Sequence, residues 1–354
     1  MSQTMDNSYL IYTSKDQEVC IERFHMCTWE FNNNGNLIEF GCELVSNSII
    51  NKNRIEIEVF VPWLTANAII TDFYTRLCDT SNSRFVFNDS VSSVFSLDGG
   101  ENLNGVIHQF SGKGRLCILP VEFKCDFDSH KIILIIDLVL YNQYDHSSFG
   151  KHPNVYFRFC IDPKIPIQTI KKGITKSTIL YDVRVNQRRN IPDFLLNEIL
   201  QKQFCLINKC FSFNIVPNTH DIVFLDDATL KNVRKLEFGS FKRYLGKDLL
   251  KEENLIVVFN KEESLDSYSF FSIYTKEHIG VDQLAVALLI NLLAGILLFI
   301  ASLNVSLFLE QKAFAFTMLP ASFWGVIVLF LLMLAYFLNR RFHRTFKIKV
   351  KNRK

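Results

Sequence analysis

The chain has 354 residues, 48% of them hydrophobic, and its 39 Lys and Arg nearly balance 36 Asp and Glu, for a net charge of +3. That length can bury a substantial core and suits about two domains, and the composition excludes collagen-like, disordered and disulfide-scaffold proteins. Eight of the basic residues lie within residues 340–354, so the rest of the chain is acidic overall, which does not favour a nucleic-acid partner.

Strand patterns dominate the first half of the chain. Residues 54–61 alternate between apolar and charged side chains, and residues 155–161 alternate in the same way. Residues 131–141 are a continuous apolar run of strand length, which predicts a central strand covered on both faces. Weaker strand patterns occupy residues 37–45, 105–110, 116–123 and 177–185.

Helical patterns are fewer. Residues 64–77 and 192–201 carry apolar side chains at helical spacing, and Asp226-Asp227 could open a third helix near residues 228–235. Further strand-like stretches occupy residues 204–213, 221–225 and 255–259. This order predicts an α+β fold rather than a regular βαβ array. We therefore expect a β-rich cytoplasmic domain at residues 1–190 and a mixed α/β cytoplasmic subdomain at residues 191–280.

Recognised signatures of catalysis and metal binding are missing from the sequence. It has no P-loop, no Gly-x-Ser-x-Gly elbow and no His-Glu-x-x-His motif. Residues 111–115 resemble a phosphate loop only in composition, and a charged hairpin turn is the favoured interpretation. Nine scattered cysteines indicate free thiols in a reducing compartment. We expect no catalytic residue, no metal and no cofactor, although a Cys–His pair that meets only in space stays open.

The most informative charge feature is residues 164–189, where seven basic residues face a single acid, Asp182. Such a concentration in an acidic domain creates a positive field that attracts anions, and guanidinium groups bind phosphate in two-point geometry. The alternatives are a solvated loop or contact with anionic lipid. The candidate residues for an anionic ligand are Lys171, Lys172, Lys176, Arg184, Arg188 and Arg189.

Two long uncharged apolar runs follow the soluble part. About 20 apolar residues span a bilayer, and the runs predict transmembrane helices near residues 284–303 and 317–338, within a hairpin at residues 281–339. Small and polar residues repeat along these spans, and they would let the helices pack closely or assemble several hairpins. These packing candidates are Ala287, Asn291, Gly295, Ala321 and Gly325.

The basic tail, residues 340–354, sets the expected orientation. Clusters of Lys and Arg next to a span stay cytoplasmic and hold anionic headgroups. Two spans return the chain to its starting side, and the first residues lack a signal-peptide pattern. The sequence thus predicts a multi-pass inner-membrane protein whose N-terminus and C-terminus are both cytoplasmic, with the lipid bilayer as a partner.

Two spans after a sensor-sized, β-rich portion resemble the two-transmembrane effectors of bacterial antiphage nucleotide-signalling systems. The resemblance rests on residues 284–303 and 317–338 and on the architecture, without a family motif in residues 1–280. It implies antiviral defence, in which a cytoplasmic domain senses a nucleotide and drives the spans to assemble as a homo-oligomer and disrupt the membrane.

Three function classes remain from the sequence. The first is a ligand-sensing membrane effector, which explains the basic stretch at residues 164–189 and the polar faces of the spans. The second is a membrane-tethered scaffold or adaptor without catalytic activity, whose soluble domain binds a protein partner. The third is a membrane-anchored enzyme with an unrecognised site, and the missing motifs weigh against it.

Overall fold

In the computed structural model of the chain, the described residues are 7–31, 35–100, 103–147, 150–173, 176–246, 254–263, 266–277, 281–309, 325, 327, 328, 330 and 331. Contacts between residues divide the chain into two compact units. The first comprises residues 1–173 and 177–276, and the second comprises residues 174–176 and 277–354. The domain boundary predicted near residue 190 falls within the first unit.

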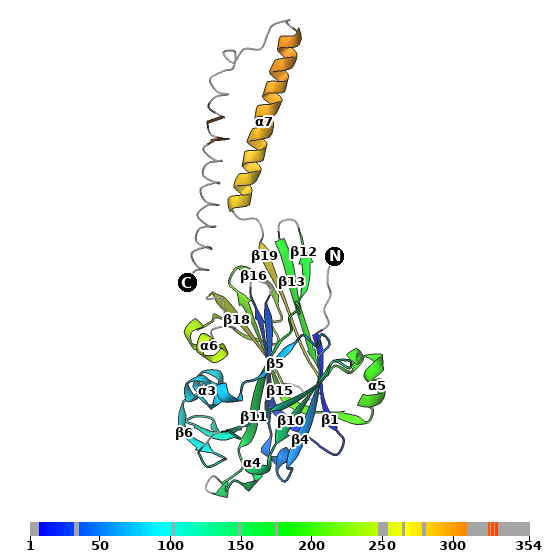
Figure 1. The fold of residues 1–354 in the computed structure, drawn as a ribbon, viewed down its shortest axis with the longest axis vertical. Helices are drawn as coiled ribbons and strands as arrows, with labels where there is room; N and C mark the ends of the chain where they lie inside the picture. The colour runs from blue at the N-terminus through cyan, green and yellow to red at the C-terminus, as the bar shows by residue number, and fades with distance from the viewer. Residues whose placement is uncertain are drawn as a thin grey trace. The chain divides into compact units, whose positions relative to one another are not determined.

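The first unit is built on two β-sheets (Figure 1). The nine-stranded sheet runs in the order β16 (His220–Leu225), β19 (Tyr268–Glu277), β13 (Lys176–Val185), β1 (Asn7–Ser14), β4 (Arg54–Phe60), β10 (Lys131–Asp137) and β9 (Glu122–Asp126), with β12 (Thr169–Lys172) paired to β13 and β14 (Lys202–Phe204) paired to β1. This sheet contains a parallel pair, in which β1 runs in the same direction as β13 and Asn7 lies opposite Val183.

The ten-stranded sheet also mixes parallel and antiparallel pairs. Its order is β17 (Leu230–Lys235), β18 (Leu255–Glu262), β15 (Leu206–Pro217), β2 (Cys20–Glu30), β3 (Asn36–Leu44), β11 (Asn154–Asp162), β8 (Gly114–Ile118), β7 (Val106–Phe110) and β6 (Val91–Ser96), with β5 (Ile69–Asp72) paired to β11. The β2–β15 and β8–β11 pairs are parallel, and the others are antiparallel.

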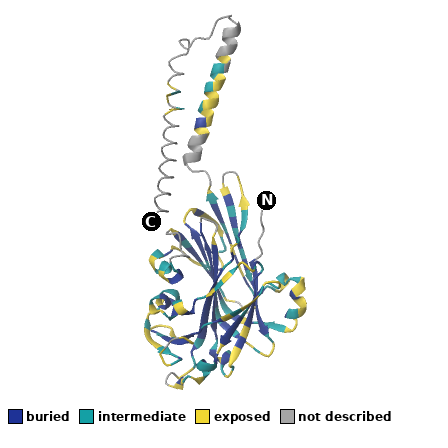
Figure 2. Ribbon diagram, in the orientation of Figure 1, coloured by how far each residue is buried: buried dark blue, intermediate teal, exposed yellow. Residues whose placement is uncertain are grey.

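The main core joins apolar residues of both sheets. The alternation predicted for residues 54–61 is confirmed, because Ile55, Ile57 and Val59 of β4 are buried in this core while Arg54 and Glu56 are exposed. From the other sheet, Phe24 and Phe40 stack in the same cluster, and their ring centroids are 5.8 Å apart. Figure 2 shows the buried residues concentrated along the strands.

Short helices border the sheets. They are α1 (Ser46–Ile49), α2 (Tyr74–Cys78), α3 (Thr80–Phe87), α4 (Val139–Gln143), the 3₁₀ turn Arg188–Asn190, α5 (Asp193–Ile199) and α6 (Phe238–Leu245). Helices α2, α3 and α6 share a second apolar cluster with strands of the ten-stranded sheet, whereas α5 packs on the nine-stranded sheet through Leu195 and Ile199. The helix predicted at residues 192–201 is confirmed as α5.

Two predicted helices are wrong. Residues 64–77 do not form one helix, because Ile69–Asp72 extends into β5 and pairs with β11, and α2 begins only at Tyr74. Residues 228–235 lie largely in β17, which pairs with β18. In both places the backbone hydrogen bonds to a distant strand outweigh the local helical spacing, as tertiary context commonly does.

The predicted fold class, an α+β domain followed by a C-terminal two-helix transmembrane hairpin, is also wrong. Helix α7 (Val281–Leu309) is present. Within the described part of the chain, no helix combines the length and apolar character needed to cross a membrane. This finding contradicts the membrane and transmembrane assignments and the multi-pass inner-membrane location. The second predicted span, apart from residues 325, 327, 328, 330 and 331, and the tail at residues 340–354 lie outside the described residues.

Candidate functional site

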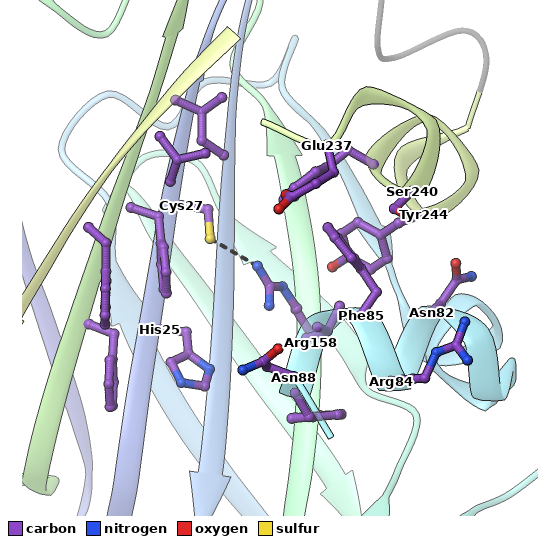
Figure 3. A pocket seen from close by; sticks show the side chains of 18 of the residues that line it. His25, Cys27, Asn82, Arg84, Phe85, Asn88, Arg158, Glu237, Ser240 and Tyr244 are labelled. Atoms are coloured by element: carbon purple, nitrogen blue, oxygen red, sulfur yellow. Dashed lines mark hydrogen bonds between the residues drawn. The ribbon is translucent and has the colours of Figure 1, made fainter. Parts of the chain in front are cut away.

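A cavity of about 680 Å³ lies on the helix-bearing face of the ten-stranded sheet. Strands β2, β15, β18 and β11 supply one side, and α3 and α6 supply the other (Figure 3). We call it the α3–α6 cavity. Its size falls within the range of about 300–1,000 Å³ that is usual for small-molecule sites.

Basic side chains outnumber acidic ones around this cavity. Among the described residues, the lining contains the single acid Glu237 and six basic residues, which are Arg23, Arg84, Lys113, Arg158, Arg234 and Arg243. Glu237 pairs with Arg234 at 3.2 Å, and Arg23 pairs at 3.3 Å with Glu43, which does not line the cavity. Arg84 and Arg243 are exposed and form no ion pair among the described residues. The cavity therefore carries net positive charge that a bound anion can neutralise.

Aromatic rings form much of the remaining wall. Phe213 and Phe259 stack nearly parallel with ring centroids 4.7 Å apart, and Phe211 stacks on Phe259 at 5.9 Å. On the helical side, Phe85 of α3 meets Phe241 of α6 edge-to-face at 4.3 Å. Such faces suit a planar ring, because offset-stacked and edge-to-face contacts stabilise aromatic pairs beyond their buried area.

A buried ion pair lies at the base of the cavity. Arg158, which lines the cavity, donates from Nε to Glu39 Oε2 at 2.7 Å, and Nη2 lies 2.7 Å from the same oxygen. Glu39 is completely buried and also accepts from Trp29 Nε1 at 2.6 Å and from the Tyr244 hydroxyl at 3.0 Å. Burial opposes the charge of Arg158, but Tyr244 and Glu39 beside it raise its pKa, so the guanidinium stays charged.

Strand register explains how residues distant in sequence meet here. On β3, Gly41 lies opposite His25 of β2 and opposite Arg158 of β11, and Glu39 lies opposite Cys27. Side chains two residues apart point to the same face of a strand, so Glu39, His25, Cys27 and Arg158 all face the cavity side. Helix α6 is held above them by Arg76, which donates to the carbonyls of Tyr244 and Leu245 at 3.1 and 2.6 Å.

The thiol of Cys27 is not an activated nucleophile. Arg158 Nη2 donates to its sulfur at 2.9 Å, yet burial raises the pKa of Cys27 to about 12. Catalytic cysteines need a lowered pKa, because the thiolate is the reactive form. The described residues contain no group of three or more His, Cys, Asp or Glu arranged to hold a metal ion.

The residues predicted to bind an anion do not converge. Lys171, Lys172 and Lys176 are exposed at one end of the β12–β13 pair, whereas Arg184 lies near the other end of β13. Arg184 pairs with Asp182, Arg189 bonds Gln187 at 3.2 Å, and the Arg188 guanidinium lies 5.9 Å from the Phe204 ring centroid. None of these six residues lines the α3–α6 cavity.

The residues predicted to pack between membrane spans make no such contact among the described residues. Ala287, Asn291 and Gly295 are exposed on α7, and Gly325 is exposed as well. A Cβ added at Gly295 or Gly325 would meet no described atom within 4 Å. Ala321 lies outside the described residues.

Sequence reasoning missed the α3–α6 cavity. The basic, glycine-rich composition of residues 111–115 is the one local signal of it. The structure confirms a hairpin turn there, between β7 and β8, and Lys113 at that turn lines the cavity. Arg84 and Arg158 are isolated in the sequence, and Arg243 belongs to a short Lys242-Arg243 pair, so no dense basic pattern marks them.

Comparison with known proteins adds no assignment. No protein-family model matches the chain. A search of curated proteins finds no significant match.

Proposed function

We propose that this protein binds a small anionic ligand with a planar ring, such as a nucleotide, in the α3–α6 cavity, and acts as a ligand sensor rather than as an enzyme. The observation that carries the proposal is the lining of the cavity, in which the described residues include six basic side chains against one acid, together with seven Phe and Tyr rings. Phosphate oxygens pair well with guanidinium groups, and a base stacks well on aromatic rings. One molecule that contains both groups satisfies both parts of the lining.

Direct binding tests the proposal. Isothermal titration of the purified chain with AMP, ATP, GTP and cyclic AMP is compared with adenosine alone and inorganic phosphate alone. We expect at least one nucleotide to bind, and adenosine and phosphate each to bind at least tenfold more weakly, because each engages only one part of the lining. Mass spectrometry of small molecules retained through purification gives an independent readout.

Two variants test whether the nucleotide binds in this cavity. Arg84→Glu and Arg243→Glu reverse exposed charges of the lining, so the fold should tolerate both. A hydrogen bond to a charged group contributes about 1.5–3 kcal/mol, so each variant should weaken nucleotide binding about tenfold or more. Arg189→Glu is the matched control, because Arg189 is also exposed but lies outside the lining. Equal weakening by Arg189→Glu would point to the predicted basic stretch instead.

The adaptor interpretation is the second candidate. It is supported by helix α5, where Phe194 is 60% exposed and Leu200, just after the helix, is 72% exposed. Exposed apolar groups of this size often mark protein contacts. If no nucleotide binds and no small molecule is retained, the cavity proposal fails and the adaptor candidate replaces it.

A further inference from the structure

A histidine at the base of the α3–α6 cavity has one ring nitrogen engaged and the other available. His25 of β2 lines the cavity and is only partly buried. Its Nδ1 lies 3.1 Å from the Tyr156 hydroxyl, and its ring meets Phe211 edge-to-face with centroids 5.0 Å apart. Among the described residues, no hydrogen bond reaches Nε2. Figure 3 shows His25 beside Cys27 and Arg158.

The Tyr156 hydroxyl determines which nitrogen of His25 carries the proton. Arg158 Nη1 donates to this hydroxyl at 3.4 Å, and a guanidinium has donors only, so the hydroxyl oxygen accepts there. Burial raises the pKa of Tyr156, so the phenol keeps its single proton. His25 Nδ1 is the hydroxyl's other described partner, and donation to it is the arrangement that gives the phenol proton an acceptor. A nitrogen that accepts is unprotonated, which leaves the proton of a neutral imidazole on Nε2.

The charges around His25 keep its ring neutral. Burial lowers the pKa of His25 well below its ordinary value, and the cations Arg158, Arg23 and Lys113 lower it further. Cys27, on the same side, remains a neutral thiol because burial raises its pKa to about 12. In the part of the chain that the structure describes, no carboxylate contacts the His25 ring, and Glu39 and Glu43 pair with Arg158 and Arg23.

We propose that His25 determines ligand specificity: the relay from Arg158 through Tyr156 holds its proton on Nε2, which presents one neutral hydrogen-bond donor to the ligand. The inference rests on the proposed function and deepens it. The preferred ligand carries an acceptor, a carbonyl oxygen or an unprotonated ring nitrogen, on its planar part. A ligand that presents a donor at this point would leave two donors facing each other, which a buried site rejects strongly.

The backbone beside the relay is adapted to it. Gly41 lies opposite both His25 and Arg158, and a Cβ at this position would overlap the Tyr156 hydroxyl. Gly41 is not in the left-handed region, so close approach is the reason for glycine here. The relay therefore requires three strands, with β3 supplying the space in which the hydroxyl meets the imidazole.

The tautomer is measured without a ligand. Long-range ¹H–¹⁵N NMR of the full chain labelled with ¹⁵N-histidine resolves the ring nitrogens of its eight histidines, and His25→Gln assigns the signals of His25. At pH 7 we expect a protonated Nε2 and an unprotonated Nδ1. Tyr156→Phe removes the phenol and should move His25 toward a mixture of tautomers, while circular dichroism checks the fold. A protonated Nδ1 or an imidazolium in the wild-type protein would overturn the inference.

Binding measurements separate the relay from the cavity's overall function. His25→Phe keeps a ring of similar shape without the donor, and His25→Gln supplies a neutral donor. For the nucleotide that binds wild type best, we expect His25→Phe to weaken binding about tenfold and His25→Gln to recover part of the loss. Unchanged binding by His25→Phe overturns the role of His25 while the proposed function stands. If wild type binds no nucleotide although the predicted tautomer is seen, the proposed function fails and the specificity role fails with it.

Discussion

The buried ion pair between Arg158 and Glu39 gives a quantitative prediction about stability. Replacing Arg158 with Met removes the guanidinium and leaves the Glu39 carboxylate, which is completely buried, with only the Trp29 and Tyr244 donors. Breaking a buried pair by removing one partner costs about 3–5 kcal/mol, because an uncompensated charge stays in a medium of low polarity. For a folded unit of this size, each kcal/mol lowers Tm by about 2–4 °C. We therefore expect Arg158→Met to lower Tm by about 6–20 °C.

A double-mutant cycle separates the charge effect from lost packing. Arg158→Met, Glu39→Gln and the double variant are compared by thermal and urea unfolding, followed by circular dichroism. Since the double variant buries no unpaired charge, it should be less destabilised than the sum of the single variants by about 0.5–3 kcal/mol.

An exposed pair provides the matched control. Arg54 and Glu56 are also joined at 2.6 Å on a strand, but their side chains are 50% and 47% exposed. Arg54→Met should cost at most about 1 kcal/mol, because solvent screens such pairs. Equal losses for Arg158→Met and Arg54→Met, or strict additivity in the cycle, would refute the reasoning that desolvation makes the Arg158–Glu39 pair costly to break.

Three further predictions concern other parts of the fold. Burial raises the pKa of Asp72 to about 6, so the native state binds this proton more tightly than the unfolded chain does. As the pH rises from about 4 to about 6, the wild-type protein should therefore lose stability in urea unfolding, and Asp72→Asn should lose less. Gly41→Ala should cost about 1–3 kcal/mol in urea unfolding, because its methyl group overlaps the Tyr156 hydroxyl; an unchanged midpoint would contradict the close approach. Glu198→Gln weakens the 2.8 Å ion pair between Lys131 Nζ and the Glu198 carboxylate of α5, so amide hydrogen exchange should accelerate in α5 while the midpoint of urea unfolding changes little. Unaltered exchange in α5 would contradict this expectation.

Strands were more predictable than helices in this chain, for a physical reason. Alternation at residues 54–61 reflects a sheet with one face in the core, and it needs no knowledge of the partner strand. The helix predictions for residues 64–77 and 228–235 rested on helical spacing over short windows. In these segments, pairing with β11 and β18 determines the structure instead. The apolar run near residues 284–303 did predict a helix, α7, although its assignment as a membrane span is contradicted.

The candidate site was much less predictable. The basic stretch at residues 164–189 predicts an anion site because its charges are close in sequence. In the structure, the extended strand β13 separates these charges in space. The α3–α6 cavity gathers cations from β2, α3, the β7–β8 turn, β11, β17 and α6, each of which contributes one lining residue. Only the pairing of β2 with β3, and of β3 with β11, brings His25 and Arg158 together.

The parallel pairing of β2 with β15 has a consequence for synthesis and folding. Cys20 pairs with Leu206 and Trp29 pairs with Ile215, so the centre of the ten-stranded sheet joins segments separated by most of the first unit. A nascent chain that has emerged only as far as β13 still presents one edge of β2 without its neighbour. Contacts of such long sequence separation slow folding, and an unpaired strand edge is the usual route to aggregation. Expression conditions that slow folding or truncate the chain before residue 217 should therefore trap this protein as aggregate rather than as a smaller folded domain.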